Sequence, residues 1–213
     1  MSRSIAVGVP GPLLAATIHW GSIGPLLVTA LAIMGSPGPA TISLTAAGSA
    51  YGVRRSLGYL VGIVAGTVVV LVAVATGITA TLLAVPALRS VLIVLSAAYI
   101  LWLAYRIATA GVGTGPRLGS APSLAGGAML GVANPKAWVA IAATFGSARL
   151  ADPATTDAAA KVALLSMVAV LIMTVWLVVG ASFAPALRDP RRARVVNLAL
   201  AATLVAATAL AVR

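Results

Sequence analysis

Uncharged, apolar stretches dominate the chain, and charged residues interrupt them only at intervals. The longest such stretch follows Arg3 and ends before Arg54, and another separates Arg55 from Arg89. An α-helix needs about 20 mainly apolar residues to cross the hydrocarbon core of a bilayer. The pattern therefore predicts six transmembrane helices, over residues 22–50, 56–84, 88–108, 122–147, 160–184 and 194–212.

The connections between these helices are short. Residues 110–121, rich in glycine and proline, form the clearest linker, and residues 151–157 form the clearest polar loop. Residues 1–21 are expected to be a lead-in. Arg3 and the apolar residues after it resemble a signal peptide, an alternative that stays open, although prolines interrupt the apolar run. The rest, residues 22–212, is expected to be one transmembrane domain.

The composition agrees with a membrane-embedded chain. Of the 213 residues, 61% are hydrophobic and 8% are charged, and the mean hydropathy is +1.11. Soluble domains carry about 25% charged residues, so this chain could not cover a water-facing surface. The predicted fold class is all-α integral membrane, because helices satisfy their backbone hydrogen bonds internally in lipid. The absence of cysteine excludes disulfides and thiol nucleophiles.

The net charge of +11 comes from basic residues placed mostly at predicted helix ends. We interpret them as contacts to membrane lipid and as topology signals, and we expect no nucleic-acid partner. Five basic residues lie on one side of the membrane, and eight lie in the loops on the other: Arg54, Arg55, Arg106, Arg117, Arg188, Arg191, Arg192 and Arg194. Basic loops stay in the cytoplasm, which predicts a multi-pass inner-membrane protein with both termini outside.

Two proline-containing motifs recur at a constant offset. Gly35-Ser-Pro-Gly-Pro39 lies in the first predicted helix, and Gly131-Val-Ala-Asn-Pro135 lies in the fourth. Each motif opens a set of three helices. Two such sets in series must be inverted, because an odd number of crossings reverses the side on which the second set begins. Inverted repeats are typical of secondary transporters, and the expected repeats comprise residues 22–109 and 122–212.

Pro37, Gly38 and Pro39 interrupt the first predicted helix within an uncharged stretch. Proline lacks the backbone N–H and clashes with the preceding turn. At membrane depth, such a backbone survives where it is buried in protein or lines a wet cavity. We expect a discontinuous helix whose second half begins near Ala40 and whose free N–H groups attract a substrate carboxylate. A simple proline kink is the alternative.

Asn134, Pro135 and Lys136 interrupt the fourth predicted helix in the same way. Lys136 and Pro39 each lie about 20 Å before the next arginine at 1.5 Å per residue, so inverted repeats would bring both breaks near the midplane. A buried ammonium costs about 2.5–3.5 kcal/mol on insertion scales, which favours a substrate-binding role. A structural lysine that reaches the headgroups is the alternative. Asn134 offers donors and acceptors to a substrate or to freed backbone.

Gly58, Gly62 and Gly66 follow a four-residue spacing in the second predicted helix. Such a stripe lets a second backbone approach closely. We expect it to pack another helix of the same chain, and a homodimer face is the alternative.

Ionisable and catalytic groups are scarce elsewhere. No Asp or Glu falls inside a predicted helix, and we expect Asp152, Asp157 and Asp189 to be solvated in loops. His19, next to Trp20, is expected at the membrane interface. The sequence shows no nucleotide-binding loop, metal cluster or catalytic dyad, so we expect no cofactor and no enzymatic activity.

These motifs resemble those of the LysE/RhtB family of amino-acid exporters, over most of the chain from about Gly35. The resemblance rests on the order and spacing of both proline motifs, the turn at Arg54 and Arg55, the three glycines, and the stretch Ala98-Tyr-Ile-Leu-Trp102. It implies six helices in an inverted repeat, export of amino acids or related compounds, and a substrate site near the proline motifs.

Two positions depart from the family pattern. Members usually have asparagine after Pro-Gly-Pro, where this chain has Ala40, and an acidic residue after the glycines, where it has Thr67. Both positions are candidates for substrate contact. A substrate ammonium here lacks its usual carboxylate partner, so solutes without a cationic amine become more plausible than usual.

The sequence favours a secondary transporter that exports amino acids or related small carboxylate-bearing solutes. A non-transporting membrane partner or scaffold that keeps the exporter fold is the second hypothesis, and the missing acid favours it. A membrane enzyme is the third, and it lacks a recognisable nucleophile or acid–base pair.

Overall fold

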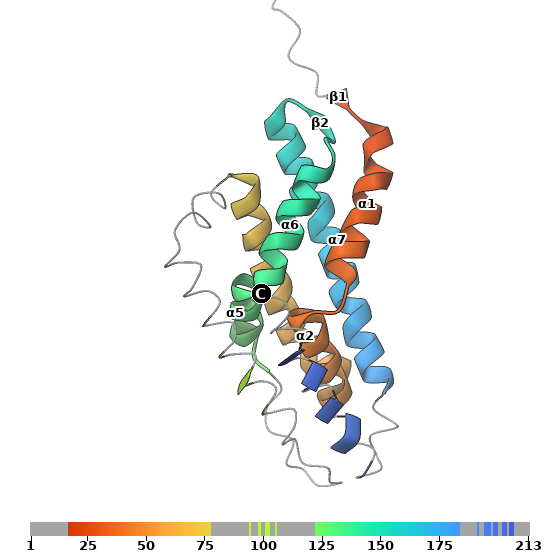
Figure 1. The fold of residues 1–213 in the computed structure, drawn as a ribbon, viewed down its shortest axis with the longest axis vertical. Coiled ribbons are helices and arrows are strands. Elements are labelled where there is room, and N and C mark those ends of the chain that lie inside the picture. The colour runs from red at the N-terminus through yellow and green to blue at the C-terminus, as the bar shows by residue number, and fades with distance from the viewer. Residues whose placement is uncertain are drawn as a thin grey trace, which may run out of the picture.

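The computed structural model describes residues 17–77 and 122–183, together with isolated positions between 94 and 206. The described elements, in chain order, are β1 (Thr17–Ile18), α1 (Trp20–Gly35), α2 (Pro39–Ala75), α5 (Leu124–Ala133), α6 (Pro135–Ser147), β2 (Ala151–Asp152) and α7 (Ala154–Ser182) (Figure 1). These segments confirm a helical protein. The expected linker at 110–121 lies outside the described residues, and the expected helices at 88–108 and 194–212 are described only at isolated positions.

The first expected helix is interrupted where its prolines indicated. α1 ends at Gly35, Ser36 and Gly38 are extended, and α2 begins at Pro39, one residue before the expected start of the second half. Proline suits this first helical position, because its missing N–H would have no intrahelical partner there.

α2 consists of two helical stretches that meet at Gly52. Gly52 has φ 75° and ψ 168°, a conformation that other residues rarely adopt. The Ser56 hydroxyl donates a 3.1 Å hydrogen bond to the carbonyl of Ala47, nine residues earlier. In a continuous helix these residues would lie about 13 Å apart, so the chain folds back at Gly52. The expected connection between the first two helices is therefore a tight reversal inside α2.

The fourth expected helix is also interrupted, because α5 ends at Ala133, Asn134 is extended and α6 begins at Pro135. The expected start of the fifth helix at residue 160 was wrong. α7 begins at Ala154, and Asp157 lies in its first turn, where an acidic side chain is favoured by the helix dipole. An acid therefore does lie inside a helix, contrary to expectation.

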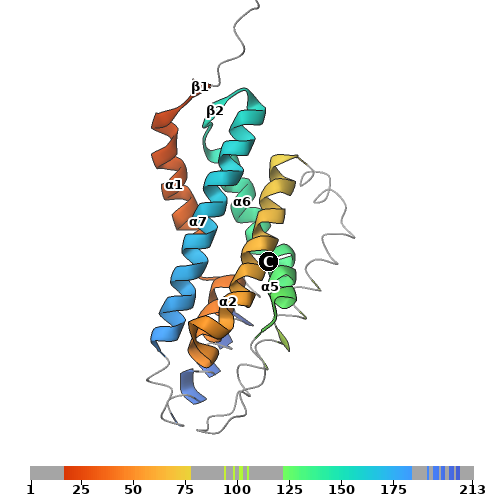
Figure 2. The ribbon, with the colours of Figure 1, turned by 180° about the vertical axis from the view of Figure 1, so that it is seen from behind.

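The two short strands show how the interrupted helices are oriented. β1 pairs antiparallel with β2, with Thr17 opposite Asp152 and Ile18 opposite Ala151. Since β1 precedes α1 and β2 follows α6, the start of α1 and the end of α6 lie at the same end of the molecule (Figures 1 and 2). α1 and α6 thus run in opposite directions.

Glycines bring α2 and α5 into backbone contact. A Cβ atom built on Gly62 would lie 2.1 Å from the Leu124 carbonyl oxygen, and one on Gly66 would lie 2.4 Å from that of Ala128. α5 therefore covers these glycines within the same chain, and they do not offer a homodimer face. Gly58 does not belong to this contact, because no described residue lies within 4 Å of a Cβ built there. The expected stripe of three glycines is therefore reduced to two in the contact with α5.

The outer faces of the long helices are apolar. Among the described residues, α2 and α7 are long and apolar enough to cross a membrane. Their exposed side chains include Val61, Val69, Met167 and Leu171. Large apolar side chains in such numbers are stable against lipid rather than water.

Candidate functional site

The two helix breaks meet through Lys136. This residue lies in the first turn of α6, and its ammonium nitrogen donates hydrogen bonds to the carbonyl oxygens of Ser36 and Pro37, the latter at 3.2 Å. Both carbonyls belong to the interruption between α1 and α2. Residues 99 and 100 positions apart in the chain are thereby joined at the point where each helix is broken.

The carbonyls freed at the end of α1 have found other donors. Pro39 has no N–H to offer the Gly35 carbonyl, and the indole Nε1 of Trp176 donates to it at 3.2 Å. The Ser36 hydroxyl donates to the Ile33 carbonyl at 2.9 Å. Buried backbone groups are rarely left unpaired, so these side chains stabilise the break. Sequence reasoning missed Trp176, whose only signal was an indole donor in an apolar helix.

The start of α2 is held by a reciprocal contact. The Gly38 N–H donates to the Thr41 hydroxyl oxygen at 2.8 Å, and the same hydroxyl donates to the Gly38 carbonyl at 3.0 Å. The N–H of Ala40 belongs to the first turn, where amides have no partner within the helix.

Glycine at position 38 leaves room for the side chain of Lys136. Its φ of −170° is accessible to any residue, but a Cβ there would lie 2.6 Å from Cδ and 3.0 Å from Nζ of Lys136. The aliphatic stem of Lys136 therefore crosses the chain at Gly38 on its way to the two carbonyls.

The break in the fourth helix is closed in a similar manner. The Asn134 side chain is buried, and its Oδ1 accepts a 3.2 Å hydrogen bond from the Lys136 backbone N–H. The indole of Trp138 donates to the Val132 carbonyl at 2.7 Å. The indole of one tryptophan thus donates a hydrogen bond to a freed carbonyl at each break. Neither tryptophan was among the predicted site residues.

A small cavity, partly open to the outside, lies between the two breaks. Five predicted site residues line it: Gly38, Ala40, Thr67, Asn134 and Lys136. The predicted residues Pro37, Pro39 and Pro135 shape the backbone around it instead. The remaining lining residues are apolar apart from Thr41: Met34, Ala137, Ala140, Ile141 and Met173.

Thr67, at the position where an acid was expected, is buried and donates its hydroxyl to the Ile63 carbonyl of its own helix at 2.8 Å. Its hydroxyl oxygen keeps acceptor capacity but carries no charge. Among the described residues, no carboxylate lines the cavity.

Backbone dipoles of both signs meet at this site. Half-helices do begin at Pro39 and Pro135, with the positive ends of their dipoles at the breaks. The negative end of α1 lies there too, and two of its terminal carbonyls accept from the Lys136 ammonium. The charge of Lys136 is therefore partly compensated by backbone dipoles.

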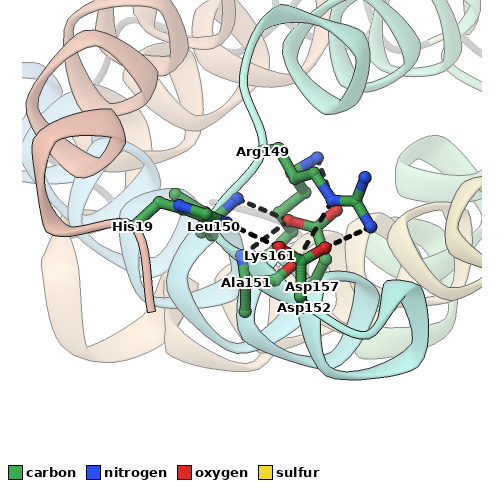
Figure 3. Close-up of polar contacts among 7 residues, drawn as sticks. All are labelled: His19, Arg149, Leu150, Ala151, Asp152, Asp157 and Lys161. Carbon is green, nitrogen blue, oxygen red and sulfur yellow. Dashed lines mark hydrogen bonds and ion pairs between the residues drawn. The ribbon is translucent and has the colours of Figure 1, made fainter. Parts of the chain in front are cut away.

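A second polar cluster lies where β1 meets β2 (Figure 3). Asp157 pairs with Lys161 at 2.8 Å and accepts from the Leu150 N–H at 2.5 Å. Asp152 pairs with His19 at 2.8 Å and with Arg149. The expectation that these acids are solvated was wrong for Asp157, whose side chain is 15% exposed, and incomplete for Asp152, which is 43% exposed but paired.

Comparison with known proteins identifies relatives. Residues 31–212 match the LysE type translocator family. Over 84 residues the chain is 43% identical to proteins named cysteine/O-acetylserine efflux protein from Salmonella choleraesuis, Salmonella typhi and Salmonella typhimurium. This match covers 39% of the present chain and 40% of the length of those relatives. No solved structure matches the chain.

Proposed function

Because the chain belongs to the LysE type translocator family, we propose that it is a secondary transporter that exports amino acids or related small carboxylate-bearing solutes across the inner membrane. The observation that carries this proposal is the meeting of two interrupted helices at one cavity, with Lys136 between them. Interrupted helices at membrane depth are the usual site of substrate binding in secondary transporters.

A carboxylate fits the donors around this cavity. The first amides of α2, at Ala40 and Thr41, have no partner within their helix, and both residues line the cavity. Lys136 has three N–H donors and uses two of them on backbone carbonyls. A carboxylate leaving water would regain charge-assisted hydrogen bonds there.

The cavity walls favour a small solute with an uncharged side chain. The apolar part of the cavity wall is formed by Met34, Ile141, Met173 and three alanines. A charged side chain would lose its hydration against these groups without a partner. The relatives' name, which refers to cysteine and O-acetylserine, agrees with small neutral amino acids, although the matched segment is 40% of those proteins.

Alternating access would follow from two inverted repeats of three helices. The opposite directions of α1 and α6 support this arrangement, as do the prolines that begin both half-helices at equivalent positions. With both termini outside, the end formed by β1 and β2 faces away from the cytoplasm. A carboxy-terminal reporter enzyme that is active only in the cytoplasm would contradict this orientation.

The proposal is tested with purified protein in proteoliposomes loaded with labelled cysteine, O-acetylserine, serine or lysine. We expect release of the neutral amino acids above that of protein-free liposomes. Release equal to that of protein-free liposomes for every solute would favour the second candidate, a membrane partner that keeps the fold without transport. Thr67, which replaces the acid that the family resemblance led us to expect, is the observation in favour of that candidate.

A further inference from the structure

We propose that the carbonyl oxygens of Ser36 and Pro37 form a binding subsite for the ammonium group of the substrate, and that Lys136 fills this subsite while the cavity is empty. The inference rests on the proposed transport function and narrows its substrate class. The solute would be a zwitterion with a protonated primary amine, and Lys136 would move from the carbonyls to its carboxylate.

The two carbonyls are suited to an ammonium group. In a continuous helix they would accept from the N–H groups four residues ahead, but the interruption at Gly38 leaves them free. They lie at the carboxyl end of α1, where the helix dipole favours a cation. The present occupant is itself a primary ammonium with three donors, so the structure already displays this recognition.

Charge prevents both ammonium groups from occupying the subsite together. Two like charges about 4 Å apart repel strongly where little water lies between them. No described carboxylate lines the cavity to offset this repulsion, since Asp152 and Asp157 are engaged at the β1–β2 end. Binding of the substrate ammonium therefore requires Lys136 Nζ to leave the carbonyls.

The surroundings of Lys136 allow this movement. Its side chain is only partly buried and lines the cavity together with Gly38, which offers no side chain to hold it in place. The four-carbon stem is flexible, and the displaced ammonium would then pair with the substrate carboxylate. A zwitterion leaves the net charge of the cavity unchanged, whereas a solute with a second ammonium adds one positive charge. Neutral amino acids are thus preferred over lysine.

The first test uses the wild-type protein in proteoliposomes and measures export of labelled L-serine with unlabelled competitors. L-glycerate replaces the α-ammonium of serine by a hydroxyl group and keeps the carboxylate. We expect unlabelled serine to compete at least tenfold more strongly than glycerate, and lysine to compete weakly. Equal competition by serine and glycerate would overturn the subsite while leaving carboxylate export intact.

The second test does not depend on transport. In Lys136→Ala the two carbonyls are vacant, so methylammonium should bind and raise Tm by about 2–4 °C. Tetramethylammonium carries the same charge but no N–H donor and should have no effect. The wild-type protein, whose subsite is filled, should respond to neither salt. Equal responses to the two salts, or no response of a folded variant to methylammonium, would overturn the inference. If the variant does not fold, the serine and glycerate competition decides.

Discussion

Two lysine ammonium groups make contacts within the described helices, and their surroundings differ in kind, because Lys161 is buried and Lys136 is half-buried. Lys161 is 5% exposed, pairs with the Asp157 carboxylate at 2.8 Å, donates to the Phe145 carbonyl at 2.8 Å, and lies 5.6 Å from the centre of the Phe145 ring. Lys136 binds two backbone carbonyls, lines a cavity and has no described carboxylate partner. A buried charge with a carboxylate partner is held in place, whereas one compensated only by dipoles can be exchanged for another cation.

The largest expected effect separates the two lysines by function. Lys136→Ala should abolish export in the proteoliposome assay, because the cavity loses its only described cation, while membrane insertion stays intact or becomes slightly easier. Lys136→Arg should restore export only in part, since the planar guanidinium group of arginine does not replace the compact ammonium group of lysine in a narrow site. Lys161→Ala is the matched control and should export normally per folded molecule. Normal efflux by Lys136→Ala at equal expression would remove this residue from the mechanism.

The second effect separates the lysines by stability. Lys161→Met leaves the half-buried Asp157 carboxylate without its charged partner, and the cost of about 3–5 kcal/mol for breaking a fully buried pair is an upper bound for this change. We expect a clear fall in the Tm of the detergent-solubilised protein. Adding Asp157→Asn should recover part of the loss, because the buried charge is then gone. If the Tm of Lys161→Met is no lower than that of Lys136→Met, the Asp157–Lys161 pair contributes no more to stability than the carbonyl contacts of Lys136 do.

A third substitution tests what places Lys136 at its carbonyls. Gly62→Leu should push α5 away from α2, and α5 leads directly into the break before Lys136. Overpacking of this kind costs about 1–3 kcal/mol, so both stability and export should fall. Gly58→Leu is the control, because no described residue lies within 4 Å of a Cβ atom built on Gly58. Equal thermal stability of the two variants would show that close helix contact is not required.

The smallest effect is expected at the exposed part of the polar cluster where β1 meets β2. His19 and Asp152 form a pair in which both side chains are more than 40% exposed. Such pairs contribute about 0–1 kcal/mol, so His19→Ala should change Tm little. A loss as large as that of Lys161→Met would show that the whole cluster, and not the Asp157–Lys161 pair, holds this end together.

Several features follow from local chemistry and were predictable. The breaks at Pro37–Pro39 and at Asn134–Pro135 follow because proline has no N–H and cannot continue a helix. The apolar outer faces follow from the scarcity of charge. The constant offset of the two motifs and the family resemblance predicted that five residues lie at one site: Gly38, Ala40, Thr67, Asn134 and Lys136.

Other features depend on contacts between distant segments. The early start of α7 placed Asp157 four residues before Lys161 on one helix face, and the β1–β2 pairing covered that face. The difference between Gly58 and Gly62 depends on where α5 lies, because both glycines have the same local spacing. The indoles of Trp138 and Trp176 reach freed carbonyls only once the helices are packed.

The sequence by itself determined that the chain is helical, apolar and interrupted at two places, because these properties depend on side-chain hydropathy and on backbone donors that proline lacks. Only the tertiary structure decided which groups meet at the interruptions. A lysine ammonium can bind an anion, a carbonyl or water with similar local geometry, and its partner is set by the helices packed around it. The carbonyls of Ser36 and Pro37 became that partner because α1 and α6 run in opposite directions and bring their breaks together.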